Sequence, residues 1–135
     1  MNGSSILTAS GIYFSYTDPL PGQIFLSDIA TSLGNTCRFT GHCQFYSVAE
    51  HCVHAAMLAH DMDLMRHALM HDAAEAYTGD LTPQLKDMLP EFRGLEMCVE
   101  AAILQRFGMI GNRHAEIKIL DMMMLKAEKK FLFPD

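Results

Sequence analysis

The stretch that decides how this chain folds and what it could bind is His71-Asp72-Ala73-Ala74-Glu75-Ala76-Tyr77-Thr78-Gly79-Asp80. It places two adjacent potential metal ligands, His71 and Asp72, and two further carboxylates, Glu75 and Asp80, within three helical turns. Few structural needs call for so many ionisable groups in so short a segment. Charged side chains on an otherwise apolar helix face are costly to bury unless they are paired or bound to a metal. The stretch therefore indicates a metal site.

A helix is predicted around this stretch because residues 64–77 contain neither proline nor glycine. Asp63 can cap its start and Gly79 can end it. At about 100° per residue, His71 and Glu75 share one face of such a helix. A nitrogen of this histidine and an oxygen of the neighbouring aspartate can therefore reach one cation.

The size and charge of the chain restrict its class. Its 135 residues predict a single domain, residues 1–135, with one core. Half of the residues are hydrophobic, so the chain is expected to fold. A net charge of −6 argues against a binder of duplex nucleic acid or tRNA, which needs a basic surface. A mononucleotide remains open as a ligand, because a cation can neutralise its phosphate locally.

The beginning of the chain and its cysteines favour a cytoplasmic protein. No Lys or Arg precedes Arg38, and no apolar run approaches 18 residues, so neither a signal peptide nor a membrane span is expected. No two cysteines form a C-x-x-C pair, which favours free thiols over disulfides. A zinc site is conceivable, although its spacing matches no familiar knuckle, from Cys37, His42, Cys43 and Cys52.

The pattern of the whole chain predicts an all-α helical bundle with a short N-terminal β-hairpin. The first 26 residues alternate loosely around Asp18-Pro19-Leu20-Pro21-Gly22, which suggests the turn of the hairpin. Ser27 should cap a short helix to Gly34, and a capping box at Ser47 and Glu50 opens a helix to about residue 60. Further helices are expected after Thr82-Pro83, over residues 90–107, and from the cap Asn112 through about residue 131.

The last of these helices is apolar on nearly every side around Met122, Met123 and Met124. It is expected to be buried all round or shared with another subunit. We therefore favour a homo-oligomer.

Four side chains from three long helices could form one interior metal site: His51, His71, Asp72 and Asp121. Taken alone, His51 would more often be a hydrogen-bonded core histidine, and Asp121 could simply pair with Lys118. Taken together, two imidazoles and two carboxylates suit a divalent Mn, Fe, Co, Ni or Zn ion with positions left for water. Open positions favour catalysis over a structural role.

These residues resemble the HD-domain metal-dependent phosphohydrolases, in which a helical histidine, a His-Asp doublet and a late aspartate occur in this order. The segment from His71 through Thr82-Pro83 to Lys86 is similar to the branch of bacterial 5′-deoxynucleotidases and small phage dATP triphosphohydrolases. Residues 35–50 and the ending Lys126-Ala127-Glu128-Lys129-Lys130 resemble the compact phage members most. The deoxynucleotidases have an Arg-Trp pair where this chain has Arg38-Phe39.

The resemblance implies a site. One divalent metal would be held by His51, His71, Asp72 and Asp121, and Mg²⁺ could accompany the substrate phosphates. Glu75, and after it Asp80, would orient the attacking water or move its proton. Arg38 and Lys86 would bind phosphate, and Phe39 would stack on the base. Plainer readings stay open: Asp80 could finish a turn, Lys86 could face solvent, and Phe39 could belong to the core.

The resemblance also implies a substrate. A dATP triphosphohydrolase that releases deoxyadenosine and triphosphate is the first expectation, since the most similar relatives are phage enzymes of this kind, in which case the protein would work in the host cytoplasm. A 5′-deoxynucleotidase acting on deoxynucleoside monophosphates is the second. A non-catalytic nucleotide-binding module that regulates a partner is the third.

Overall fold

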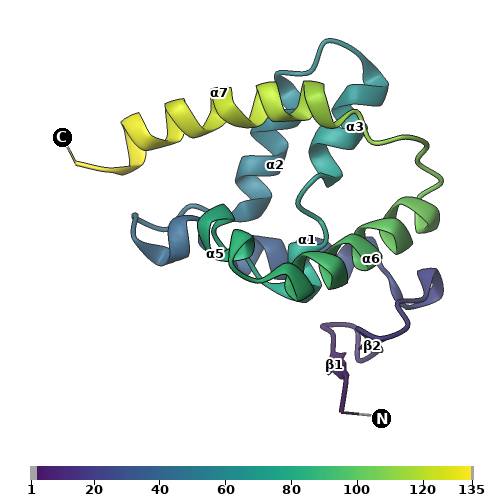
Figure 1. Cartoon of the computed structure of the whole chain (residues 1–135). Helices are drawn as coiled ribbons and strands as arrows, with labels where there is room; N and C mark the ends of the chain where they lie inside the picture. The colour runs from purple at the N-terminus through teal and green to yellow at the C-terminus, as the bar shows by residue number, and fades with distance from the viewer. Residues whose placement is uncertain (1–2, 135) are drawn as a thin grey trace.

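The computed structural model describes residues 3–134 and is mostly helical. It confirms a helical bundle with a short two-stranded hairpin (Figure 1). In chain order the elements are β1 (Ser5–Leu7), β2 (Tyr13–Ser15), the 3₁₀-helix η1 (Pro21–Gln23), α1 (Leu26–Asn35), the 3₁₀-helix η2 (Phe39–Gly41), α2 (Val48–Met57), α3 (Met62–Met70), α4 (Glu75–Thr78), α5 (Pro83–Asp87), α6 (Pro90–Arg106) and α7 (His114–Leu132). Helix α7 packs across α2 and α3.

The hairpin lies earlier in the chain than predicted. Strand β1 pairs antiparallel with β2, with Ser5 opposite Ser15, and the chain reverses where the Thr8 N–H donates to the Ile12 carbonyl. The predicted turn at residues 18–22 instead leads into η1. Pro21 takes the first position of that 3₁₀-helix, where its missing N–H is not needed, so the prolines begin a helical turn and do not connect two strands.

Of the predicted caps Ser27, Ser47, Thr82 and Asn112, the structure confirms Ser47 and Thr82. The Glu50 N–H donates to Ser47 Oγ at 3.0 Å and the Ser47 N–H donates to the Glu50 carboxylate at 2.7 Å, which completes the capping box of α2. Thr82 caps α5. The prediction that Ser27 caps α1 is wrong, because the helix begins at Leu26 with Phe25 at the cap position. Asn112 is not the cap of α7, because Arg113 takes that position, although the Asn112 side-chain oxygen accepts a hydrogen bond from the His114 N–H.

The helix predicted over residues 64–77 is divided in two. Asp61, not Asp63, caps α3, because its carboxylate accepts the Leu64 N–H at 2.7 Å. After Met70 the chain forms tighter i→i+3 turns through residues 71–74 before α4, which Gly79 ends as predicted with a φ of 87°. The side chain of His71 contributes to the break, since its Nδ1 donates to the Ala68 carbonyl at 2.6 Å.

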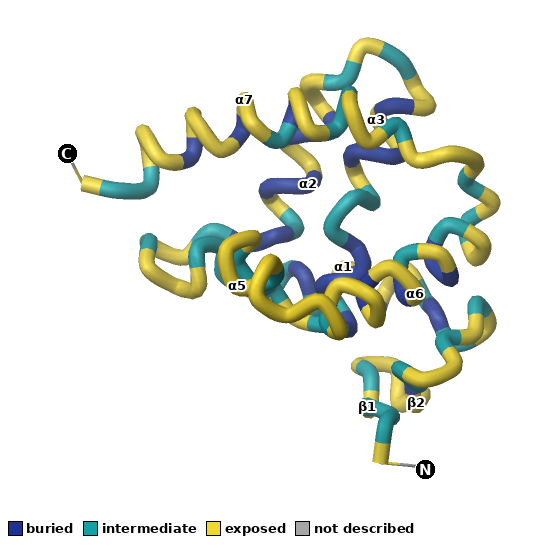
Figure 2. The backbone as a smooth tube through the Cα atoms, viewed as in Figure 1, coloured by how far each residue is buried: buried dark blue, intermediate teal, exposed yellow. Residues whose placement is uncertain are grey.

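The core consists of two clusters that meet at α2 (Figure 2). The larger one joins the hairpin to α1, α2, α4 and α6, and includes Phe14, Val48 and Val99. The smaller one lies between α2, α3 and α7, and includes Leu64 and Leu120. Burial of these apolar surfaces fixes α2, α7 and the 71–74 turn relative to one another.

We predict that Phe14→Ala destabilises the protein by about 3–5 kcal/mol, the usual cost of emptying a large aromatic site in a core. Phe14 is fully buried, and its ring stacks on Tyr77 of α4 at a centroid distance of 4.1 Å. Chemical denaturation of the variant measures the effect. Tyr13→Ala, on the exposed side of the same strand, is the control. A loss below 1 kcal/mol for Phe14→Ala would show that the hairpin does not support the core.

Helix α7 is not buried all round in the single chain. Leu120 and Met124 face the core, but Ile119, Met122 and Met123 are 53–62% exposed. That part of the prediction is wrong because α2 and α3, the main packing partners of this helix among residues 3–134, cover one side of it. The alternative, that another copy of the chain covers its outer face, stays a prediction. Over residues 3–134, none of the helices is both long and apolar enough to span a bilayer.

Candidate metal centre

The four predicted ligands meet at one point between α2, the 71–74 turn and α7. His51 Nε2 lies 2.7 Å from Asp121 Oδ1 and 3.6 Å from Asp72 Oδ2. His71 Nε2 lies 3.2 Å from Asp72 Oδ2 and 3.4 Å from Asp121 Oδ1. Among the residues that the structure describes, two groups of three side chains that share His71 could hold a metal ion: His51, His71 and Asp121 form one, and Cys52, His71 and Asp72 form the other.

His71 gives the clearest sign that a cation fits. Its Nδ1 must carry a hydrogen, because its partner, the Ala68 carbonyl, can only accept. Its Nε2 is buried and makes no hydrogen bond, although two carboxylate oxygens lie within 3.4 Å. In the neutral ring this atom presents a lone pair to two anions. A metal ion between them would remove the repulsion and satisfy the orphaned nitrogen.

Electrostatics at the cluster also favour a positive charge. Burial opposes protonation of His71 and His51, but the neighbouring carboxylates outweigh it and raise the pKa of both rings. Burial likewise opposes ionisation of Asp72 and Asp121, yet the two histidines lower the pKa of both carboxyls. The two carboxylates and the two imidazoles therefore favour a positive charge at the imidazoles.

Glu128, near the end of α7, orients the first histidine. Its carboxylate is 4% exposed and lies 2.8 Å from His51 Nδ1, so this nitrogen can donate to it while Nε2 faces the other ligands. The second carboxylate oxygen accepts from Arg38 Nη2 at 2.9 Å. A carboxylate behind a metal-binding histidine holds the ring and increases its basicity. Sequence reasoning gave Glu128 no role, because only the fold brings it next to His51.

We predict that Glu128→Gln weakens metal binding about 10- to 100-fold, the usual effect of removing such a carboxylate. Titration of the metal-free protein with Co²⁺ or Mn²⁺, followed calorimetrically, measures this. Glu91→Gln, on the exposed first turn of α6, is the matched control. An unchanged affinity would show that Glu128 supports only Arg38.

The raised histidine pKa values predict a pH dependence. A histidine whose pKa rises on folding stabilises the metal-free protein fully below its ordinary pKa of 6.5, and this stability is lost as the pH rises toward the folded value. The melting temperature of the metal-free protein should therefore fall above about pH 6.5, while metal should bind more tightly. The pKa of Glu75 is also raised, so Glu75 too should make the melting temperature fall as the pH rises. The measurement of melting temperature against pH is therefore repeated with Glu75→Gln. A melting temperature that rises with pH in both proteins would contradict this.

A cavity of about 410 Å³ opens beside the cluster, and it gathers the other predicted site residues. We call it the basic cavity, because Lys86 and Lys129 line it together with Arg38. Its wall also includes Asp72 and Asp121 from the cluster, and Phe39, Glu75 and Asp80.

Each predicted substrate residue in the basic cavity already has a partner. Arg38 binds Glu128, and its Nε is buried without a hydrogen bond. Lys86 Nζ pairs with the buried Glu96 at 2.8 Å, so it is not simply solvent-facing. Phe39 is half-buried, with the Arg38 guanidinium 5.0 Å from its ring centre.

Glu75 is held as a neutral acid. Its side chain is buried at the start of α4, and burial together with Asp72 and Asp80 raises its pKa far above the ordinary value. A carboxyl that keeps its proton at neutral pH can act as a proton donor. Glu75 thus lines the same cavity as Asp72, and its surroundings favour the protonated carboxyl.

Cys52, predicted only as part of a conceivable zinc site with Cys37, His42 and Cys43, lies beside the histidine–carboxylate cluster instead. It follows His51 in α2, and its sulfur lies near the ligand atoms of His71 and Asp72. Burial raises the pKa of its thiol, which favours a neutral packing role. The alternative zinc site does not form in residues 3–134: Cys37 and Cys43 approach to 3.9 Å, but Cys52 belongs to the cluster instead. All four cysteines are free thiols.

The fold and this cluster define a helical protein with a histidine–carboxylate centre that could hold a metal ion. No protein-family model matches the sequence. The chain is 39% identical over 130 residues to YfdR of Escherichia coli (strain K12), which is described as an uncharacterized protein; the match covers 96% of this chain and 72% of YfdR. The chain therefore belongs to the same family as YfdR.

Proposed function

We propose that this protein is an HD-domain, metal-dependent deoxynucleotide phosphohydrolase, with dATP triphosphohydrolase as the first candidate activity. The observation that carries the proposal is the meeting of His51, His71, Asp72 and Asp121 at one point beside a cavity. A bundle interior would not gather two histidines and two carboxylates, one of them with an orphaned nitrogen between anions, for packing alone.

The four ligands would hold one divalent ion, which would polarise a phosphate oxygen and acidify a water molecule. Glu75 holds a proton at its carboxyl and lies next to Asp72, so it can protonate the departing ester oxygen. Asp80 lies beside Glu75 and helps to keep that proton in place. Arg38 and Glu128 keep the His51 ring oriented.

The charges of the basic cavity support a phosphate ligand. Arg38, Lys86 and Lys129 come from three separate elements and face the same space. Asp72, Glu75, Asp80 and Asp121 line the same cavity, so a phosphate would need the metal ion as well as these cations.

A 5′-deoxynucleotidase is the second candidate, and a specific observation favours it. Arg38 and Lys86 are each paired with a buried carboxylate, Glu128 and Glu96, so less positive charge is left for a ligand. A monophosphate would need less positive charge from the cavity than a triphosphate. The third candidate is a non-catalytic regulatory module, which would have the same fold and bind a nucleotide but would not hydrolyse it. Self-association through the exposed apolar side of α7 is compatible with each of the three.

One assay separates the candidates. The protein is loaded with Co²⁺, Mn²⁺, Zn²⁺, Fe²⁺ or Ni²⁺, with and without Mg²⁺, and incubated with each dNTP and dNMP. Inorganic phosphate is resolved from triphosphate. Triphosphate from dATP supports the first candidate, and phosphate from dNMPs supports the second. If no metal gives a product, the hydrolase proposal is wrong and the regulatory module remains.

A further inference from the structure

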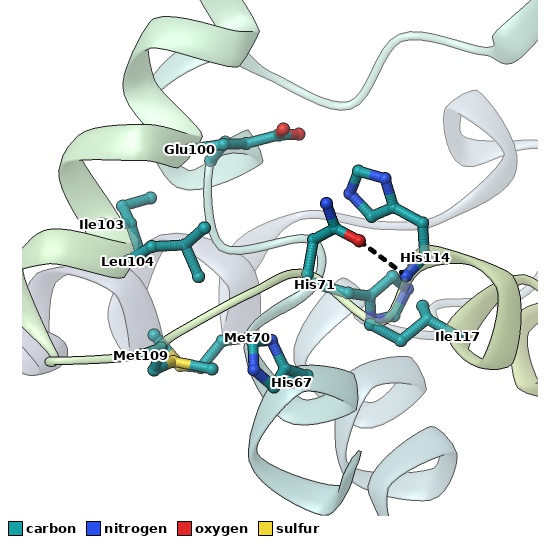
Figure 3. A pocket seen from close by; sticks show the side chains of 11 residues that line it. His67, Met70, His71, Glu100, Ile103, Leu104, Met109, His114 and Ile117 are labelled. Carbon is teal, nitrogen blue, oxygen red and sulfur yellow. Dashed lines mark hydrogen bonds between the residues drawn. The ribbon is translucent and has the colours of Figure 1, made fainter. Parts of the chain in front are cut away.

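A second cavity, of about 230 Å³, is lined by His71 of the metal centre (Figure 3). We call it the apolar cavity; its wall includes Ile103, Leu104 and Met109. Figure 3 shows Glu100, from α6, and His114, from the first turn of α7, on its upper side.

Helix α7 connects the two cavities. His114 and Ile117 line the apolar cavity, while Asp121, Leu125 and Lys129 line the basic cavity. These positions are spaced by three or four residues, so they form one stripe along one face of the helix. The cavities therefore follow each other along α7, and the boundary between them falls at the ligand Asp121.

Side chains of residues 71–75 also line both cavities. His71 and Ala74 line the apolar cavity, whereas Asp72 and Glu75 line the basic one. The adjacent ligands His71 and Asp72 thus face different cavities. Two independent segments place the metal centre at the junction of the two spaces.

The two cavities differ in chemistry. Arg38, Lys86 and Lys129 line the basic cavity together with four carboxylates, while neither lysine nor arginine lines the apolar cavity over the described part of the chain. The apolar cavity instead combines aliphatic walls with a carboxyl, an amide and imidazoles, the groups that hydrogen-bond the edge of a base. Its volume lies below the usual range for drug-sized ligands, which suits a nucleoside and not a whole nucleoside triphosphate.

We infer that the apolar cavity binds the nucleoside part of the substrate and that the basic cavity binds its phosphates. This inference rests on the proposed function and extends it. The bond between the α-phosphorus and the 5′-oxygen then lies at the metal centre. Water oxygen bonds to phosphorus, the bond to the 5′-oxygen breaks, and that oxygen takes a proton, so that deoxynucleoside and triphosphate leave on opposite sides.

With the nucleoside in the apolar cavity, the base does not stack on Phe39. That ring lines the basic cavity and is already in contact with the Arg38 guanidinium and, at 5.1 Å, with the edge of Phe133. Glu100 and His114 become the side chains that select the base. Phe39 then borders the phosphates and carries no base preference.

The test measures the two products separately on the metal-loaded protein. Calorimetry gives the affinity of deoxyadenosine and of inorganic tripolyphosphate for the unchanged protein and four variants. Glu100→Ala and His114→Ala should each weaken deoxyadenosine binding about tenfold and leave tripolyphosphate within twofold, since each removes one hydrogen-bonding group. Lys86→Ala should do the opposite, and Phe39→Ala should leave deoxyadenosine binding unchanged. His114 is exposed, so its variant serves if Glu100→Ala fails to fold.

The results separate this inference from the proposed function. If dNTPs are hydrolysed but deoxyadenosine binding is lost in Phe39→Ala and kept in Glu100→Ala and His114→Ala, the hydrolase stands and the inference is wrong. Absence of any deoxyadenosine binding at millimolar concentration also overturns it. If no nucleotide is hydrolysed while deoxyadenosine binding depends on Glu100 and His114, the cavity assignment stands and the hydrolase proposal is wrong.

Discussion

Asp72→Ala is expected to abolish both bound metal and turnover. The Asp72 carboxylate lies 3.2 Å from His71 Nε2 and 3.6 Å from His51 Nε2, so it contacts both imidazoles of the centre. Alanine removes a ligand and a negative charge, which leaves two histidines and the half-exposed Asp121 to hold an ion. Elemental analysis after dialysis measures metal per chain, and the product assay measures turnover.

Asp87→Ala is the matched control for this substitution. Asp87 is an exposed aspartate at the end of α5 that pairs with Arg93 on the surface. It should keep the metal content and the activity of the unchanged protein. If Asp72→Ala retains one metal ion per chain, the centre described here is not where the metal binds, and the hydrolase proposal loses its basis.

Glu75→Gln is expected to keep the metal and lower the rate by about 10²- to 10⁴-fold, the range for removing a positioned acid or base. Glu75 is buried beside the cluster, and its raised pKa keeps a proton on the carboxyl. Glutamine has nearly the same shape but cannot give up a proton as an acid does. Single-turnover measurements with saturating substrate separate the chemical step from binding.

For Glu75→Gln, metal content and rate are measured on the same sample, because a loss of metal would itself lower the rate. Glu91→Gln, exposed on α6, should change neither. Normal turnover by Glu75→Gln would remove Glu75 from the reaction and make Asp80 the candidate proton donor. Loss of metal as well as rate would show instead that Glu75 supports the centre through Asp72.

Local sequence signals predicted much of the helical framework. The capping box at Ser47 and the Thr82-Pro83 start act within a single turn, so neighbouring residues suffice to specify them. The hairpin was misplaced because prolines are compatible both with a turn between strands and with the start of a 3₁₀-helix. The division of the 64–77 helix was missed because it involves the side chain of His71 bonding to a carbonyl.

The residue types of the centre could be read from the sequence, since a His-Asp doublet in an apolar segment needs a partner wherever it lies. Their partners could not. Glu128 reaches His51 across 77 positions of the chain, and Arg38 reaches Glu128 across 90. Only packing of α7 over α2 makes these contacts, and spacing in the sequence carries no signal for them.

The sequence alone thus determined that the chain is mainly helical, the caps Ser47 and Thr82, and the choice of four side chains able to bind a cation, because these depend on chemistry within a turn or within one residue. The tertiary structure decided that these side chains meet, that His71 Nε2 is left facing two carboxylates, and that cavities open beside them. The physical reason is that burial of apolar surface, which acts between distant segments, sets how the helices are placed.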